Sequence, residues 1–364
     1  MRTSLSRAKR RLSPHLFFAA AGLGMLLVVS IAAAAPGAAK QRTLTTRAPV
    51  IALAADGERA ALLVHARGFC ARIVVWQPMR QRVVRLYSAT YGCVEGNPFY
   101  RDVALAGTRA AWLQAGGGNT LETIVMTATL ARPKPVWVAI GAATGGYGTF
   151  ARRPVGNGTL LAFTLDRKCA DYEGSQNPCP PGRKTGDVID ATLWRMPGSG
   201  RCPYAAGPRP VHLCARVAHA NGELSVLAVD GGRIAARTDD GVSLLTAEGK
   251  VLHQFDVRAR QAALSGNRLA VRTADAVEVY DTGSGELTAQ FPVAPSLRLE
   301  DFDDGILVTA DGRTVTLRRL GDGRVRTIRT ARIAHAQLER PGLFVAAGRR
   351  VTFTPMRDVL RRLG

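Results

Sequence analysis

Short apolar runs with strand-type alternation recur along the chain, and each follows a glycine-centred turn. The first copy reads DGERAALLV from Asp56, and the fifth reads SGNRLAVRT from Ser265. Alternation with a period of two is typical of β-strands. Spacings of mostly 35 to 51 residues between the turns are those of repeat units that build propellers or solenoids. The seven turns are marked by Gly57, Gly107, Gly158, Gly231, Gly266, Gly305 and Gly342.

The copy from Gln261 to Phe291 displays a complete unit. One strand precedes the turn at Gly266, RLAVRT follows it, AVEVY comes next, and ELTAQF closes the unit after a second turn. Four antiparallel strands of this kind make one propeller blade. Seven copies therefore predict an all-β fold, a single seven-bladed β-propeller of four-stranded antiparallel blades.

The units resemble the repeats of the WD-repeat and quinoprotein-type β-propeller superfamilies over roughly residues 42–360. The clearest local match is AVEVYDTGSGELTAQF at Ala276 to Phe291, which is similar to their strand, D-x-x-T-G turn and strand element. No copy has the Gly-His plus Trp-Asp pair. Phe255 and Phe291 stand where quinoprotein blades carry a docking tryptophan. The resemblance therefore implies the architecture, and we expect no quinone or other cofactor.

The last unit, which starts at Ile333, shows only three strands, while residues Gln41 to Arg47 form a spare segment before the first unit. A closed ring of blades leaves no exposed sheet edge between its first and last units. We therefore predict that this segment supplies the missing outer strand of the last blade.

The N-terminus has the layout of an export segment. Five bases and no acid precede Leu16, and the run from Leu16 to Ala35 is uncharged over 20 residues. Such a run is either a cleaved signal peptide or a single membrane-anchoring helix, because its length suits both. We expect residues 1–39 to be this signal or anchor and residues 40–364 to be the propeller. The location would be extracytoplasmic, either secreted or anchored to the cell membrane.

Six cysteines follow the export segment, where an oxidising compartment lets disulfides persist. Six cysteines permit 15 pairings, and we expect neighbours to pair: Cys70 with Cys93, Cys169 with Cys179, and Cys202 with Cys214. Cys202, His212 and Cys214 could instead suggest zinc, but this spacing matches no strong ligand pattern. We therefore predict no metal site.

The third unit is stretched to 73 residues by insertions at Asp166 to Val188 and Pro197 to Leu213. Loops on a rigid scaffold usually carry function, so we predict a binding surface on the loops of the first three units. The competing interpretation is that these loops are solvated connections held by disulfides. The candidate residues are Tyr91, Phe99, Tyr100, Arg101, Arg167, Lys168, Tyr172, Arg183 and Lys184.

The chain carries a formal charge of +21, much of it in an arginine-rich C-terminal part. A basic stripe on the outer strand of the sixth unit would attract wall polymer, acidic lipid or nucleic acid. The alternative, which we favour, is a solvated strand whose charge protects an edge. Its members are Arg318, Arg319, Arg324, Arg326, Arg329 and Arg332.

The sequence contains no catalytic motif, and we read DFDDG at Asp301 to Gly305 as a turn rather than a calcium loop. We expect a monomeric, non-enzymatic binding or scaffold protein of the bacterial cell envelope. Its partner would be an envelope protein or an anionic wall polymer, and not nucleic acid. The alternative is a propeller-class hydrolase or lyase with its site at the channel mouth. That alternative predicts histidines and acids gathered at the axis with perturbed pKa values.

Overall fold

The computed structural model describes residues 41–65, 71–88, 99–117, 119–144, 147–172, 175–204 and 213–364, without the side chains of residues 88 and 99–101. The chain divides into two compact parts, residues 1–39 and residues 40–364. The fold described below is that of residues 40–364. The expected signal or anchor lies outside the described residues. Within the part of the chain that is described, no helix is both long enough and apolar enough to cross a membrane.

The described residues form an all-β fold of antiparallel sheets. Four sheets have four strands in chain order. The first contains β2 (Val50–Asp56), β3 (Arg59–His65), β4 (Ala71–Gln77) and β5 (Arg82–Ser88). The next contains β15 (Leu224–Asp230), β16 (Arg233–Thr238), β17 (Gly241–Thr246) and β18 (Val251–Phe255). Another contains β19 (Gln261–Ser265), β20 (Arg268–Arg272), β21 (Ala276–Asp281) and β22 (Leu287–Pro292). The fourth contains β23 (Arg298–Asp303), β24 (Ile306–Asp311), β25 (Thr314–Arg319) and β26 (Val325–Arg329).

A nine-stranded sheet contains the second and third units. Its strands are β6 (Phe99–Ala106), β7 (Arg109–Gly116), β8 (Thr120–Thr129), β9 (Val136–Thr144), β10 (Tyr147–Ala151), β11 (Val155–Asn157), β12 (Leu160–Lys168), β13 (Val188–Arg201) and β14 (Leu213–Ala220). The two units join because β10 pairs with both β9 and β12. Pro154, which lacks a backbone N–H, stands between β10 and β11 and interrupts the innermost strand there.

The last sheet combines strands from the two ends of residues 40–364. It contains β27 (Ala334–Glu339), β28 (Gly342–Ala347), β29 (Arg350–Pro355) and β1 (Arg42–Thr45). Strand β1 pairs antiparallel with β29, so that Arg42 faces Phe353 and Thr45 faces Arg350. The prediction that the spare N-terminal segment supplies an outer strand is therefore confirmed.

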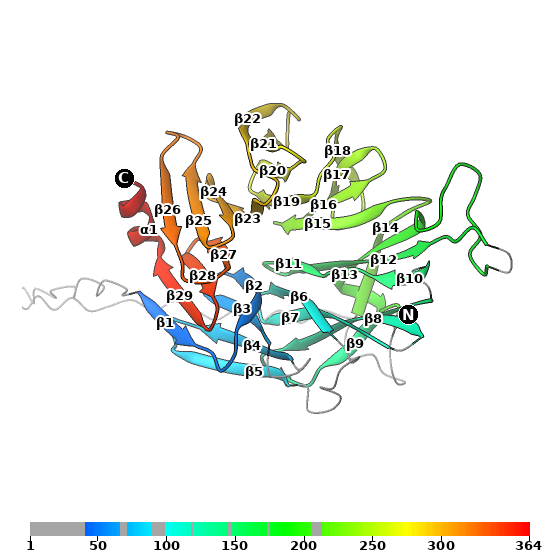
Figure 1. Ribbon diagram of the computed structural model, residues 1–364, viewed down its shortest axis with the longest axis horizontal. Coiled ribbons are helices and arrows are strands. Elements are labelled where there is room, and N and C mark those ends of the chain that lie inside the picture. Colours follow the sequence, from blue (N-terminus) through cyan, green and yellow to red (C-terminus); the bar gives the residue numbers. More distant parts are fainter. Residues whose placement is uncertain are drawn as a thin grey trace, which may run out of the picture. The chain divides into compact units, whose positions relative to one another are not determined.

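The innermost strands lie around a common axis (Figure 1). Contacts link β2 to β6, then to β11, β15, β19, β23 and β27, and from β27 back to β2. The glycine turns after these strands adopt positive φ, as at Gly57 (56°) and Gly266 (53°), where a side chain would be strained. These turns mark one face of the ring, which we call the glycine-turn face.

Apolar side chains of adjoining sheets pack into one another between the sheets. Ile73 of β4 and Trp112 of β7 are fully buried in one such cluster. Trp76 and Phe344 join the first sheet to the last, with ring centroids 6.2 Å apart. Residues 60–64 of β3 are all buried, because this strand is inside a sheet whose two faces are both covered. It therefore reads as a continuous apolar run rather than an alternating one.

Two features of the fold differ from the sequence predictions. Strand β13 continues to Arg201, so the second insertion of the third unit is partly strand, with an irregular register between Arg195 and Gly200. A C-terminal helix, α1 (Met356–Leu363), follows β29 and was not predicted. It forms because Val359 and Leu363, one turn apart, are buried against the last two sheets.

Candidate functional site

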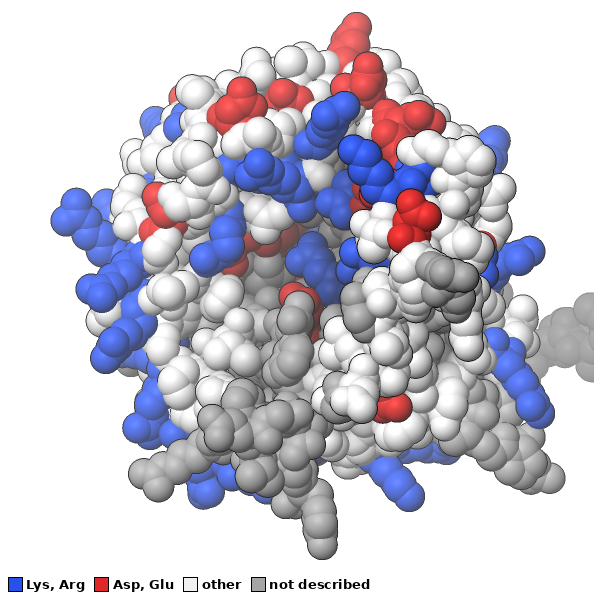
Figure 2. Space-filling view, turned by 45° about the vertical axis from the view of Figure 1, so that its right-hand side comes forward, with Lys and Arg blue, Asp and Glu red and all other residues white. Residues whose placement is uncertain are grey.

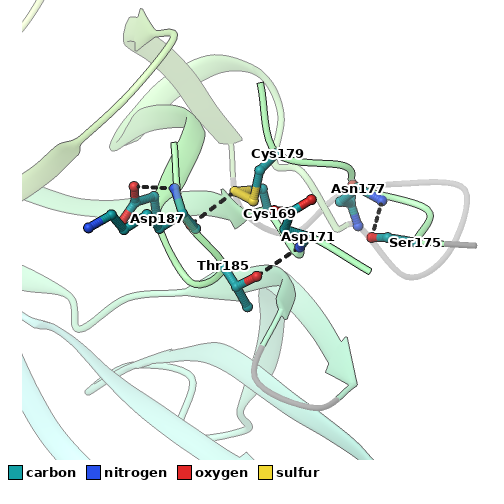
Figure 3. The surroundings of a disulfide bond; sticks show 8 residues. Cys169, Asp171, Ser175, Asn177, Cys179, Thr185 and Asp187 are labelled. Atoms are coloured by element: carbon teal, nitrogen blue, oxygen red, sulfur yellow. Dashed lines mark hydrogen bonds between the residues drawn. A yellow bond between two sulfur atoms is a disulfide. The ribbon is translucent and has the colours of Figure 1, made fainter. Parts of the chain in front are cut away.

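The insertion between β12 and β13, residues 169–187, is stapled at its base (Figure 3). The sulfur atoms of Cys169 and Cys179 are 2.12 Å apart, and those of Cys202 and Cys214 are 2.03 Å apart. Both pairs are thus at disulfide distance, as neighbour pairing predicts. The third expected pair, Cys70 and Cys93, lies outside the described residues.

The stapled insertion is ordered by its own hydrogen bonds. The Asp171 amide donates to Thr185 Oγ1 at 2.8 Å, and the Lys184 amide donates to Asp187 Oδ2 at 2.8 Å (Figure 3). The Cys169 amide donates to the Asp187 carbonyl at 3.0 Å. These bonds bring the two ends of the insertion together. The side of the ring on which the insertion lies is opposite the glycine-turn face, and we call it the insertion face.

The insertion also reaches the neighbouring sheet. Arg183 Nη2 lies 2.8 Å from Asp239 Oδ2, in the turn after β16. This hydrogen bond, together with the guanidinium charge, holds the pKa of Asp239 below its ordinary value. Tyr172 packs on Tyr147 with ring centroids 5.1 Å apart. Arg183 therefore bridges the third and fourth units across the insertion face.

A cavity of about 870 Å³ opens beside this bridge, and we call it the basic mouth. Its apolar wall includes Leu113, Leu121 and Phe150. The space-filling view shows a hollow with charged side chains gathered around it, most of them Lys and Arg (Figure 2). Its bases are Arg152, Arg153, Lys168, Arg183, Arg237 and Arg260, and its acids are Asp102, Asp187, Glu223 and Asp239.

Phe150 anchors two of these bases. The Arg152 guanidinium and the Lys168 ammonium lie 5.4 and 5.6 Å from its ring centroid, within cation–π range. Arg152 also donates to the buried Asp166 at 2.7 Å through Nε. Burial raises the pKa of Asp166, and the Arg152 hydrogen bond opposes that rise. The position of Arg152 is therefore fixed by both an ion pair and a ring.

The six bases differ in whether an acid neutralises them. Arg152, Arg183 and Arg237 pair with Asp166, Asp239 and Glu223, respectively. Among the described residues, no carboxylate forms an ion pair with Arg153, Lys168 or Arg260. Three cations of the mouth are therefore outside its ion pairs, and so are two of its acids, Asp102 and Asp187.

The structure brings only part of the predicted binding surface to this cavity. Lys168 and Arg183 line it, whereas Arg167, Tyr172 and Lys184 do not. Tyr91 lies outside the described residues, and of Phe99, Tyr100 and Arg101 only the backbone is described, as the start of β6.

Arg152, Arg153, Arg237 and Arg260 were missed as candidates. They come from strand ends in the third to fifth units, and the signal was weak: basic residues directly before an inner strand, as in RRP at 152–154 and RAR at 258–260.

A second cavity of about 340 Å³ follows the axis and is lined by the innermost strands. Here Glu300 lies 3.7 Å from His335 and 2.7 Å from Arg298. Burial opposes ionisation of Glu300, but the bonds and charges of these two partners hold its pKa below the ordinary value. Burial raises the pKa of Asp301 to about 7 and that of Glu339 to about 9, where the charge of Asp301 also contributes.

These axial acids accept hydrogen bonds from backbone amides, two of which belong to neighbouring units. Asp301 accepts from the Phe302 amide at 2.8 Å and from the Leu338 amide at 2.7 Å. Glu339 accepts from the Gly57 amide at 3.0 Å, which connects the last unit to the first. Innermost strands have no strand partner on the axial side, so side chains of adjacent units satisfy their amides. In the described residues, no cluster of three or more His, Cys, Asp or Glu side chains is placed to hold a metal.

Comparison with known proteins gives a structural relationship only. No protein-family model and no curated protein matches the chain. A chain in a crystal structure titled as a mitotic checkpoint complex aligns with TM-score 0.52 and 11% identity, over 86% of this chain and 94% of its own. The Cps50 (Swd1) β-propeller domain of Myceliophteria thermophila aligns with TM-score 0.50 and 12% identity, over 85% and 98%. With the sheet topology, these alignments establish the fold: the chain is a β-propeller.

Proposed function

We propose that the chain is a seven-bladed propeller that acts as an exported binding module of the bacterial cell envelope. The blade number rests on the closed cycle of innermost strands from β2 to β27. On this count the nine-stranded sheet is two blades joined through β10. Export is supported by the uncharged run of residues 16–35 and by two cysteine pairs at disulfide distance, which suit an oxidising compartment.

The observation that carries the binding role is the basic mouth. It combines an apolar wall with three cations that form no ion pair with a described residue, and four acids interrupt the bases around its rim. A uniform polyanion would meet repulsion from those acids. A segment with alternating acidic and apolar side chains could instead match both the cations and the apolar wall. We therefore identify the ligand as an acidic-apolar segment of an envelope protein, in preference to a wall polymer.

The test uses the full chain in non-ionic detergent and a fluorescent eight-residue peptide that alternates Glu with Leu or Phe. We expect K168E/R260E to weaken binding at least tenfold. The matched control, K134E/K250E, reverses two exposed lysines in turns on the glycine-turn face and should leave binding unchanged. Equal binding of the Gln-substituted peptide, or no effect of K168E/R260E, would refute the proposal. Tighter binding of a glycerol-phosphate polymer than of the peptide would identify a polymer ligand instead.

The axial cavity supports a second candidate, a hydrolase or lyase, because His335 and several acids with shifted pKa values meet there. Against it, both carboxylate oxygens of Asp301 already accept backbone hydrogen bonds. The discriminating measurement is turnover of ester, phosphate, peptide and glycoside substrates by the full chain and by E300Q. Turnover that E300Q abolishes without a change in melting temperature would favour the enzyme.

A further inference from the structure

Six arginines gather on the glycine-turn face where the last two sheets meet, and we call this cluster the arginine corner. Three come from the end of β25, the following turn and β26, and three come from α1. The members are Arg319, Arg324, Arg326, Arg357, Arg361 and Arg362. Contrary to the expectation of a stripe on one outer strand, Arg318 and Arg319 belong to β25, and Arg318 stacks 4.5 Å from the Phe291 ring.

The fold itself brings the two halves of this corner together. Helix α1 buries Val359 and Leu363 in the same cluster as Leu317 of β25 and Ile328 of β26. A Cβ placed on Gly364, at the helix end, would stand 3.5 Å from Arg324 Nη1. The helix therefore presents its polar side outward next to the β25–β26 turn.

The acids of the corner neutralise only part of its charge. Asp322 pairs with Arg319 at 3.1 Å and Arg324 at 3.4 Å, while Asp358 pairs with Arg361 at 3.1 Å and approaches Arg357 at 3.9 Å. Six guanidinium groups thus stand against two side-chain carboxylates, so positive charge is in excess at the corner. Arg326 and Arg362 are exposed and form no ion pair with any described residue.

The described chain begins at this same corner. Arg42 pairs with Phe353, two residues before β29 ends and α1 begins, so residue 41 enters on the glycine-turn face beside the helix. The uncharged run ends at Ala35. The six peptide steps from Ala35 to Gln41 span at most about 22 Å when fully extended. If the run stays in a bilayer, this connection limits how far the start of β1 can lie from the lipid headgroups.

We propose that the arginine corner docks on an anionic lipid surface to which the N-terminal run holds the chain. Each base near such a surface contributes to attraction that acts over roughly one Debye length, about 8–10 Å at physiological salt. The connection is short enough to let the corner approach the lipid surface to that distance. Val325, 48% exposed in the same region, adds an apolar contact for the headgroup layer.

The experiment places the full chain in nanodiscs of either phosphatidylcholine alone or phosphatidylcholine with phosphatidylglycerol. Hydrogen exchange is then followed in peptides covering residues 320–330 and 356–364. We expect exchange at least threefold slower in the anionic discs, with the protection lost at 0.5 M salt and in R326E/R362E. The control K134E/K250E, with two reversed charges on the same face in other sheets, should retain it.

Equal exchange in the two disc types, or protection that persists in R326E/R362E, would overturn the proposal. Protection that appears in neutral discs only when an RNA oligonucleotide or a glycerol-phosphate polymer is added would also overturn it in favour of that ligand. The result is separable from the basic mouth, because K168E/R260E should leave corner protection intact and R326E/R362E should leave peptide binding intact.

Discussion

Glu339 at the ring closure gives the most specific prediction for stability. Its carboxylate accepts from the Gly57 amide at 3.0 Å, and burial followed by the charge of Asp301 raises its pKa to about 9 from 4.5. In the unfolded chain the same group ionises near 4.5, so the folded state binds the extra proton between these pH values. Stability must then fall as the pH rises from about 4.5 to 9. The variant E339Q keeps the amide acceptor and removes this titration.

The expected gain follows from the size of the shift. At 1.36 kcal/mol per pKa unit, the group costs the wild type up to about 5 kcal/mol at pH 8. Solvent screening of this partly exposed side chain reduces that value to about 2–3 kcal/mol. With an unfolding entropy of about 2.1 cal/mol/K per residue over residues 40–364, this gain raises the melting temperature of E339Q by roughly 3–4 °C above that of the wild type.

The assay is thermal unfolding of the full chain and of E339Q at pH 5, 6, 7, 8 and 9, followed by circular dichroism. The advantage of E339Q should be small at pH 5 and grow up to pH 9. The control E286Q removes an exposed carboxylate in the β21–β22 turn and should track the wild type. Parallel curves for E339Q and the wild type, or a destabilised E339Q at pH 8, would show that Glu339 does not carry a buried proton.

Three further predictions test closure, the helix and the insertion. Leu44 of β1 packs against the cluster of the first and last sheets. The variant L44D should therefore destabilise the fold by about 2–4 kcal/mol in urea unfolding. The control T45D, at an exposed position, should change the free energy of unfolding by less than about 0.5 kcal/mol. L363A should cost about 2–4 kcal/mol and speed hydrogen exchange in α1, while R362A does neither. R183A should change stability by less than about 1 kcal/mol, because its pair with Asp239 is partly exposed. The same variant should speed exchange in residues 175–187, and an unchanged rate would contradict the bridging role.

The sequence predicts the framework well where local signals decide it. In the turn DTGSG at Asp281 to Gly285, Asp281 accepts from the Gly283 amide at 2.9 Å and the Ser284 amide at 2.8 Å, and Gly285 takes a φ of 77°. Residue type and spacing are enough to fix this turn. The runs on either side of the turn likewise specify β21 and β22, because Val277 and Val279 of β21 and Ala289 and Phe291 of β22 recur with a period of two and pack in one cluster.

Other elements depend on contacts that the local sequence does not reveal. Arg272 reads as the polar end of RLAVRT, yet it is 1% exposed. Its guanidinium donates to the Leu297 carbonyl at 3.1 Å and the Ala294 carbonyl at 3.0 Å, which lie on the connection to the next sheet. Burial of this kind lowers the pKa of Arg272. The basic mouth was missed for the same reason: Lys168 and Arg260 are 92 positions apart in the chain and meet only when the ring closes.

The two proposed surfaces lie on opposite faces of the same ring, and the topology requires this. Strand β1 runs antiparallel to β29, so its first residue lies on the glycine-turn face, where α1 also begins. The connection from β12 to β13 must emerge on the other face, because β12 runs away from the glycine-turn side and the antiparallel β13 returns to it. A chain held at the membrane through residues 16–35 and the arginine corner would therefore direct the basic mouth away from the lipid. In that orientation an envelope partner could reach Lys168 and Arg260 without competing with the bilayer.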